Sequence, residues 1–408
     1  MSLLENKFLK LGAEYAPGQE VRQDTNEVEL RFEKIPGTPV DFSHGDVDAF
    51  EPIPGSLDVF NEGVHLGGKQ AYTEYRGSID IRENVAEKLS VFSGTTINAD
   101  RNFIITPGTQ GALFLAMGST ISRGDKVAIV VPDYFANRKL VEFFEGEVIP
   151  IQLDYFKTDT SAGLDLTQLE AAFKAGVKLF LFSNPNNPTG VIYSKDEIRG
   201  IAELAQQYGA TVIVDELYSR QIFEGRSYIH LSAQNIVDPE NVITIMGPSK
   251  TESLSGYRLG VAYGSSKIID RMEKLQAIVS LRAGGYSQAV LKSWFSEPEG
   301  WMTERIAQHQ AIRDDLVTKL RTADGFKVRA TEAGSYLFPR IPKLGISINE
   351  FVKVLRLQAG VIVTPGSEFG PQFTDSFRVN FSQDHKAAVD AIDRVIQVVE
   401  AYRNEYVK

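Results

Sequence analysis

Short apolar runs alternate with stretches of helical pattern through the middle of the chain, and this alternation restricts the possible folds more than any other feature. Ser194 and Glu197 form the pattern of a capping box between two of the runs, and Gly209 marks the end of that helix. Runs that are rich in β-branched residues and apolar on both faces are typical of buried parallel strands. The sequence therefore predicts a parallel sheet covered by helices. The five runs are Val127–Pro132, Glu147–Leu153, Val177–Ser183, Thr211–Asp215 and Val242–Met246.

The pattern changes after about residue 290. A long helical stretch over Met302–Arg321 precedes short strand-like runs at 326–328, 335–339 and 377–381, and a closing helix is predicted from about Ala387. The 408 residues also exceed the roughly 250–300 that share one hydrophobic core. We therefore expect an α/β protein with a three-layer large domain around a mostly parallel central sheet, plus a smaller α+β domain.

The expected domain boundaries follow from the same change of pattern. Residues 1–55 are predicted to be an irregular N-terminal arm and a segment that contributes to the small domain. Residues 56–290 are predicted to form the large domain, and residues 291–408 the small C-terminal domain.

Composition excludes several classes of function. The net charge of −10 argues against nucleic acid and anionic membranes as partners. The chain has no cysteine, which excludes disulfides, thiolate nucleophiles and cysteine-based zinc sites. The five histidines are scattered, and nothing points to a metal site. The N-terminus carries charges throughout, and no stretch approaches the ~20 apolar residues of a membrane span, so we expect a cytoplasmic protein.

Two motifs at strand ends could bind an anion or display amides. Phe103–Ala112 (FIITPGTQGA) reads as an apolar strand, then Gly108, Thr109 and Gln110, then a helix whose first N–H groups are free. On its own, this motif could be an ordinary strand-to-helix turn. The second motif, Ser183–Gly190 (SNPNNPTG), displays several asparagines after a buried strand, and its alternative is a plain loop.

Two further motifs supply charged groups at strand ends. Asp215, in VDELYS, ends an apolar strand where a carboxylate needs a partner, although it could also cap the next helix. Lys250, in GPSKTESLSGYRLG, follows another buried strand and could act as a nucleophile; its alternative is a solvated surface lysine. Ser249 and Arg258 offer a hydroxyl and a fork of donors to a phosphate. Ligands bind outside the carboxyl ends of strands in open α/β sheets, so all four motifs are predicted to share one pocket.

Taken together, the motifs TPGTQGA, NPNNPTG, DELY, SKTESLSGYRLG and FRVNFS resemble those of the pyridoxal-phosphate (PLP) dependent aminotransferases of class I/II, fold type I, which are aspartate aminotransferase-like. The resemblance extends from Val40–Asp48 (VDFSHGDVD) to the closing helix. It implies an enzyme that moves an amino group between an amino acid and a 2-oxo acid by a ping-pong mechanism, with PLP held as a Schiff base on Lys250. Another outcome with the same cofactor, by a lyase, decarboxylase, cyclase or oxidase, stays open. A regulator's PLP-binding domain would need a helix-turn-helix extension, and none is evident.

The resemblance also implies roles for single residues. Lys250 would be the general base and acid that moves a proton at the substrate α-carbon. Asp215 would pair with the protonated pyridine nitrogen. Asn187 and Tyr218 would hydrogen-bond the phenolic oxygen of the ring, and Tyr134 would stack on the ring. The phosphate would be bound by Gly108, Thr109, Gln110, Ser249 and Arg258.

For the substrate, the resemblance implies that Arg378 clamps the α-carboxylate, with help from the Gly45 backbone and Asn187. Asp375 is the alternative, purely structural partner of Arg378. His44 departs from the aliphatic residue that many relatives carry there, and both a structural and a substrate-lining role are open. A second departure is Gly247, where some relatives have a serine.

One tyrosine implies a partner subunit. Tyr72, in YTEYRGSIDIR, corresponds to a residue that reaches the cofactor phosphate of the neighbouring subunit in similar enzymes. The resemblance therefore implies a homodimer with shared active sites. Arg282 is either a partner for a substrate side-chain carboxylate across the interface or an ordinary interface arginine.

Overall fold

The structure is a computed structural model that describes residues 2–12, 16, 18–19, 22–25, 28 and 30–403. At its centre lies a seven-stranded sheet with strand order β2-β8-β7-β6-β5-β3-β4. Strand β8 pairs antiparallel with both of its neighbours, whereas the other adjacent pairs are parallel. The predicted mostly parallel sheet is thus confirmed. The strands are β2 (Phe103–Pro107), β3 (Lys126–Val131), β4 (Glu147–Gln152), β5 (Leu179–Ser183), β6 (Thr211–Asp215), β7 (Val242–Met246) and β8 (Leu259–Gly264).

Helices cover both faces of this sheet, as the alternation of its side chains requires. Val127 and Ile129 pack in one core with helices α5 (Gly108–Gly118), α6 (Phe135–Phe143) and α9 (Ser266–Val279). Ala128 and Val130 point to the other face, which carries α7 (Leu166–Lys174) and α8 (Lys195–Tyr208), with α4 (Ile79–Ser93) farther along. The predicted capping box at the start of α8 is present, and Gly209 ends this helix in the left-handed conformation. The predicted three layers are confirmed.

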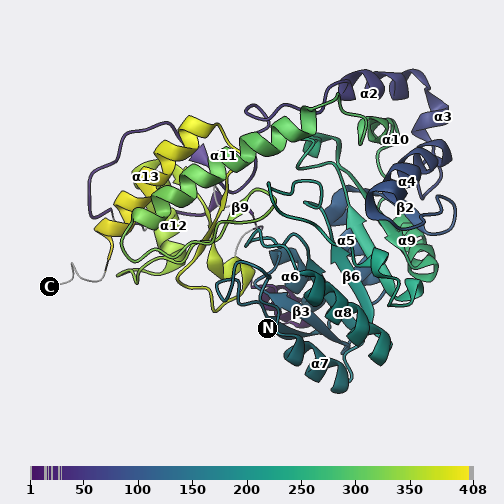
Figure 1. The fold of residues 1–408 in the computed structure, drawn as a ribbon, viewed down its shortest axis with the longest axis horizontal. Helices are drawn as coiled ribbons and strands as arrows, with labels where there is room; N and C mark the ends of the chain where they lie inside the picture. Colours follow the sequence, from purple (N-terminus) through teal and green to yellow (C-terminus); the bar gives the residue numbers. More distant parts are fainter. Residues whose placement is uncertain are drawn as a thin grey trace.

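A second, smaller group of elements contains a three-stranded sheet of order β11-β12-β9. Its helices α11, α12 and α13 lie together, away from the helices around the large sheet (Figure 1). Val40, Phe42 and Phe50 share one hydrophobic core with these helices, so the segment near residue 40 packs with the C-terminal part of the chain. The elements are β1 (Val40–Asp41), β9 (Tyr336–Leu337), β10 (Val361–Ile362), β11 (Thr364–Pro365), β12 (Phe377–Asn380), α11 (Trp301–Thr322), α12 (Ile348–Ala359) and α13 (His385–Ala401).

Short helices complete the described chain. They are α1 (Leu3–Lys10), α2 (Ser56–His65), α3 (Gly68–Ala71), α10 (Gly285–Gln288) and the 3₁₀ helices η2 (Ser232–Gln234), η3 (Pro239–Asn241), η4 (Ser255–Tyr257), η5 (Ala289–Ser293) and η6 (Gly366–Phe369). None of the helices that the structure describes is long and apolar enough to cross a membrane.

Two local predictions were wrong. Residues 3–10 form helix α1 rather than irregular chain, because Ser2 and Glu5 build a capping box that sequence inspection had overlooked. The run at 326–328 is not a strand, since Lys327 forms only an isolated bridge to Arg340. We propose the division at residues 56 and 291 on the basis of the packing described above; its outer ranges include positions outside the described residues.

Candidate functional site

A cavity of about 490 Å³ opens at the carboxyl ends of the parallel strands, where the four motifs were predicted to meet. It is bounded by the segments that follow β2, β3, β5, β6 and β7, and by side chains from the smaller group of elements. Ten predicted residues line it together: Thr109, Gln110, Tyr134, Asn187, Asp215, Tyr218, Ser249, Lys250, Arg258 and Arg378.

One end of this cavity is built to receive an anion. Gly108 begins α5 with a φ of +74°, and a Cβ there would lie 2.6 Å from Nη2 of Arg258. A Cβ on Gly260 would lie 2.4 Å from the backbone nitrogen of Thr109, so the two glycines allow the start of α5 and strand β8 to approach closely. The free N–H groups of a helix start and a guanidinium therefore meet at one point, which favours a phosphate or similar anion.

A buried carboxylate lies at another part of the cavity. Asp215 ends β6, is 7% exposed and accepts a hydrogen bond from the backbone N–H of Leu217 at 3.1 Å. Burial raises its pKa to about 6; the Leu217 N–H opposes this shift and the charge of Glu216 adds to it. A carboxylate whose ionised form is disfavoured in this way would be stabilised by a cationic partner.

Asp133, which was not among the predicted site residues, connects two of the site's segments. Its carboxylate accepts hydrogen bonds from the backbone N–H and hydroxyl of Ser183, and from the backbone N–H of Tyr134 at 2.6 Å. Burial raises its pKa to about 7. Asp133 therefore holds the turn that carries Tyr134 against the loop that carries Asn187. The signal was a carboxylate directly after the apolar run Val127–Pro132, the same position that drew attention to Asp215.

Tyr336 is a second residue that the sequence did not reveal. The Tyr218 hydroxyl lies 2.6 Å from the Tyr336 hydroxyl, and both rings line the cavity beside Lys250. Burial raises the pKa of Tyr218 well above its ordinary value, so this phenol keeps its proton. No motif marks Tyr336, because its place depends on packing between parts of the chain that are far apart in sequence.

Arg378 reaches the cavity from β12 and is only 4% exposed. Its Nη1 donates to Oδ1 of Asn187 at 3.0 Å, its Nη2 donates to the Ser43 carbonyl at 2.9 Å, and its guanidinium lies 4.5 Å from the centre of the Tyr336 ring. Its buried Nε has no partner among the described residues. Asp375 instead lies 3.8 Å from Nε of Arg340, so the suggested Asp375–Arg378 pair is wrong.

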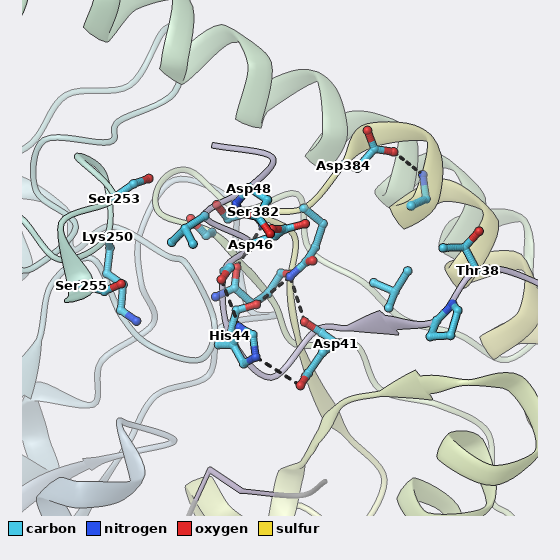
Figure 2. A pocket seen from close by; sticks show the side chains of 18 of the residues that line it. Thr38, Asp41, His44, Asp46, Asp48, Lys250, Ser253, Ser255, Ser382 and Asp384 are labelled. Atoms are coloured by element: carbon cyan, nitrogen blue, oxygen red, sulfur yellow. Dashed lines mark hydrogen bonds and ion pairs between the residues drawn. The ribbon is translucent and has the colours of Figure 1, made fainter. Parts of the chain in front are cut away.

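A second cavity of about 1180 Å³ adjoins the first and shares Lys250, Ser249 and Tyr218 with it. His44 and Gly45 line this second cavity, and His44 is bonded to Asp41 there (Figure 2). These two predicted residues therefore line the adjoining cavity and not the one into which Arg258 and the start of α5 project.

Tyr72 is not brought to either cavity within one chain. It is 82% exposed, and its ring centre lies 5.5 Å from the Arg282 guanidinium. Among the described residues, no group of three or more His, Cys, Asp or Glu side chains is placed to hold a metal ion.

Comparisons with known proteins agree on one family. The sequence model of "Aminotransferase class I and II" matches residues 46–395. An aspartate aminotransferase structure from Rhodobacter sphaeroides is 63% identical, with a TM-score of 0.93 over 98% of this chain and 100% of that one. The aspartate aminotransferase of Sulfolobus acidocaldarius is 28% identical over 82% of this chain and 83% of its own length. An aromatic aminotransferase structure from Pyrococcus horikoshii shares the fold, with 22% identity and a TM-score of 0.81 over 89% of this chain and 96% of that one.

Proposed function

The chain belongs to the aminotransferase class I and II family, and we propose that the cavity at Lys250 is where it exchanges an amino group between an amino acid and a 2-oxo acid. The observation that carries this proposal is the convergence of a lysine, a buried carboxylate and a helix start with an arginine in one cavity. Members of this family are PLP-dependent transferases.

The donor set of the cavity fits PLP. Its phosphate matches the anion-binding end formed by the start of α5, Ser249 and Arg258. Its pyridine nitrogen, when protonated, matches Asp215, because burial raises the pKa of this carboxylate and a cationic partner would stabilise its ionised form. We propose that Tyr134 lies against the ring, and that Asn187 and Tyr218 donate to its phenolic oxygen.

PLP, when bound, supplies the carbonyl that takes up the amino group and a ring that delocalises the electron pair left on the substrate. Residues of the chain would bind the substrate and transfer the protons. Lys250 would attach the cofactor and, once displaced, its Nζ would remove and return the proton at the substrate α-carbon. Asp215 would keep the ring nitrogen protonated. We propose that Arg378 holds the α-carboxylate through its fork of donors, aided by the Gly45 backbone.

Arg378→Lys tests the last assignment. We expect the folded protein and its bound cofactor to survive, and the KM for the amino donor and for the oxo acid to rise at least about tenfold, because lysine cannot reproduce a bidentate contact. Steady-state kinetics with both substrates measure this. Unchanged KM values in a folded variant would rule out the carboxylate role. Arg340→Lys is the matched control, because Arg340 pairs with Asp375.

Transamination can be distinguished from the other PLP reactions by its first half-reaction, which needs only the amino donor. An amino donor alone should convert the bound cofactor stoichiometrically to its amine form and release one 2-oxo acid per site, and adding a 2-oxo acid should reverse this. Since the 63% identical chain is an aspartate aminotransferase, aspartate is the first donor to test. Release of ammonia or carbon dioxide without this conversion would favour a lyase or a decarboxylase.

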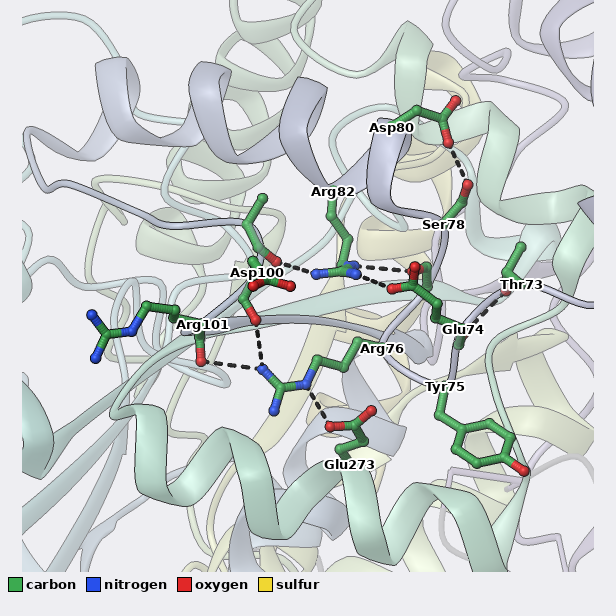
Figure 3. A network of polar contacts seen from close by, with 12 residues as sticks. Thr73, Glu74, Tyr75, Arg76, Ser78, Asp80, Arg82, Asp100, Arg101 and Glu273 are labelled. Atoms are coloured by element: carbon green, nitrogen blue, oxygen red, sulfur yellow. Dashed lines mark hydrogen bonds and ion pairs between the residues drawn. The ribbon is translucent and has the colours of Figure 1, made fainter.

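We also propose a homodimer in which Tyr72 contributes to the partner's cavity. Tyr72 follows α3, and exposed apolar side chains lie on α2, α9, α10 and the nearby loops, as expected of an interface. Figure 3 shows how the following segment is fixed: Arg82 contacts Glu74, and Arg76 contacts Glu273 at 2.6 Å. Tyr72 therefore projects next to an anchored segment. The apolar residues are Leu57, Val64, Leu66, Tyr75, Ile278, Val279, Leu281 and Tyr286.

Mixed subunits test this arrangement. Lys250→Ala and Tyr72→Phe proteins, dissociated and reassociated together, should regain activity, because one site of each hybrid combines a native Lys250 with a native Tyr72. Turnover before and after mixing is the measurement. Mixing Lys250→Ala with Tyr75→Phe is the control. Failure of the Tyr72 mixture to exceed the mean of its unmixed components would contradict sharing. A cytoplasmic location also remains our proposal.

A further inference from the structure

We propose that His44 is a positioning residue for the substrate carboxylate: as an imidazolium, it ties Asp41 to Gly45 and so holds the turn whose Ser43 carbonyl orients Arg378. The inference rests on the proposed role of Arg378. It is carried by the contacts of the turn that follows β1.

The contacts of His44 favour its protonated form. Its Nδ1 lies 3.0 Å from the Gly45 carbonyl oxygen, and its Nε2 lies 3.2 Å from Oδ2 of Asp41. The Gly45 carbonyl can only accept, and the Asp41 carboxylate also only accepts when it is ionised, so each contact is a hydrogen bond only if the ring nitrogen donates. A neutral imidazole carries only one N–H, so the protonated ring is the form that makes both bonds at once.

The surrounding charges agree with this conclusion. The hydrogen bond to Asp41 raises the pKa of His44 to about 9, while burial and the charge of Lys250 oppose the shift. Burial alone would raise the pKa of Asp41, but hydrogen bonds from His44 and Ser43 outweigh it and hold this pKa below its ordinary value. The other titratable groups that line the same cavity are Asp46, Asp48, Tyr218, Asp384, Lys386 and Asp390.

Asp41 transmits the position of His44 to the substrate site. Its Oδ1 accepts from the backbone N–H of Ser43 at 2.8 Å and from the Ser43 hydroxyl at 2.5 Å. The Ser43 carbonyl in turn accepts from Nη2 of Arg378 at 2.9 Å. One carboxylate therefore holds Ser43, whose carbonyl orients the guanidinium. His44 contacts the other oxygen of that carboxylate (Figure 2).

Other hydrogen bonds of the turn do not involve the His44 side chain and should persist when it is replaced. The Phe42 N–H donates to the Ile362 carbonyl at 2.8 Å, which holds the start of the turn against β10. Gln383 donates through Nε2 to the carbonyls of Asp41 and His44 at 2.9 and 2.6 Å. The His44 side chain itself is 65% exposed towards the cavity, so replacing it removes its two bonds without leaving a buried hole.

The sign of the pH dependence follows from the raised pKa. The ordinary histidine value is 6.5, and the value in the folded chain is about 9. The interaction is therefore complete below about pH 6.5 and is lost as the pH rises through about 9. In Asp41→Asn, the new Nδ2 would donate to Nε2 of a neutral ring, while Nδ1–H could still donate to the Gly45 carbonyl. The pKa of His44 should therefore fall back towards its ordinary value, and the contact should be lost below that pH instead of above it.

Two measurements on the cofactor-loaded enzyme test the inference without turnover. The first is NMR of isotope-labelled histidine side chains; with five histidines in the chain, the signal lost in His44→Gln identifies His44. We expect a midpoint near pH 9 in the wild type and a clearly lower one in Asp41→Asn. A wild-type midpoint near 6.5 would contradict the proposal that His44 is an imidazolium at neutral pH.

The second measurement is the affinity for succinate, an unreactive dicarboxylate, followed through the absorbance of the bound cofactor. We expect about tenfold weaker binding in His44→Gln at neutral pH, the effect of one charge-assisted hydrogen bond. In Asp41→Asn, the affinity should rise between pH 6 and 8 relative to the wild-type profile, because only the neutral ring can accept from the Asn Nδ2. The wild-type profile corrects for any titration of the cofactor or probe. His385→Gln is the control, since His385 forms a separate pair with Asp315 at 2.8 Å.

The outcomes separate this inference from the proposed function. Wild-type affinity in His44→Gln, together with weakened binding in Arg378→Lys, would overturn the positioning role and leave the Arg378 assignment intact. Wild-type affinity in Arg378→Lys would remove the assignment of Arg378, and with it this inference. If His44 positions Arg378, the KM of His44→Gln should rise for both substrates by a larger factor than kcat falls.

Discussion

Lys250→Ala is expected to lower turnover by at least about 10⁴-fold, because the substitution removes both the nucleophile and the general base. Lys250 lies at the junction of the two cavities and is only partly buried, so the fold should survive. Single-turnover kinetics and thermal unfolding measure the two effects. Lys386→Ala is the matched control, since Lys386 lines the larger cavity but not the smaller one. A loss of less than about tenfold in Lys250→Ala would contradict the proposed role.

Asp215→Asn is expected to act in opposite directions on activity and on the stability of the cofactor-free protein. Turnover should fall at least about 100-fold, because the variant lacks the charge that keeps the ring nitrogen protonated. The pKa of Asp215 is raised from 3.8 to about 6, so ionisation opposes folding; this cost begins near pH 3.8 and is complete above about pH 6. Asparagine removes the cost and can still accept from the Leu217 N–H.

Denaturant unfolding of the cofactor-free proteins tests the second half of this prediction. At pH 7 the variant should be more stable than the wild type by up to about 3 kcal/mol, and the difference should vanish at about pH 4. Equal stabilities at pH 7 would show that ionisation of Asp215 does not destabilise the cofactor-free protein. Near-normal turnover in the variant would mean that the cationic partner of Asp215 is misassigned.

The residues that could be predicted lie where a buried strand ends. Asp215 and Lys250 could be predicted because a charged group directly after a buried apolar run is costly unless it has a partner. Asn187 could be predicted because its loop is unusually rich in asparagine and proline. Strand β8 was missed because glycines at both 260 and 264 weaken the pattern of a strand.

The residues that could not be predicted owe their positions to contacts between distant parts of the chain. Tyr336 meets Tyr218, and Ser43 meets Arg378, across sequence separations of 118 and 335 residues. In both pairs at least one group carries no local signal: Tyr336 lies in a short apolar run, and Ser43 acts through its backbone carbonyl. Two readings of His44 were open from sequence, and only the contacts with Asp41 and Gly45 favour positioning.

Borohydride reduction of the cofactor-loaded protein, followed by peptide mapping, tests the central claim most directly. Reduction makes the bond between the cofactor and its lysine permanent, so the labelled peptide identifies that lysine without any assay of activity. We predict a single labelled peptide, the one that contains Lys250, and no label in Lys250→Ala. A label on any other lysine would contradict the assignment of the site and of every role derived from it.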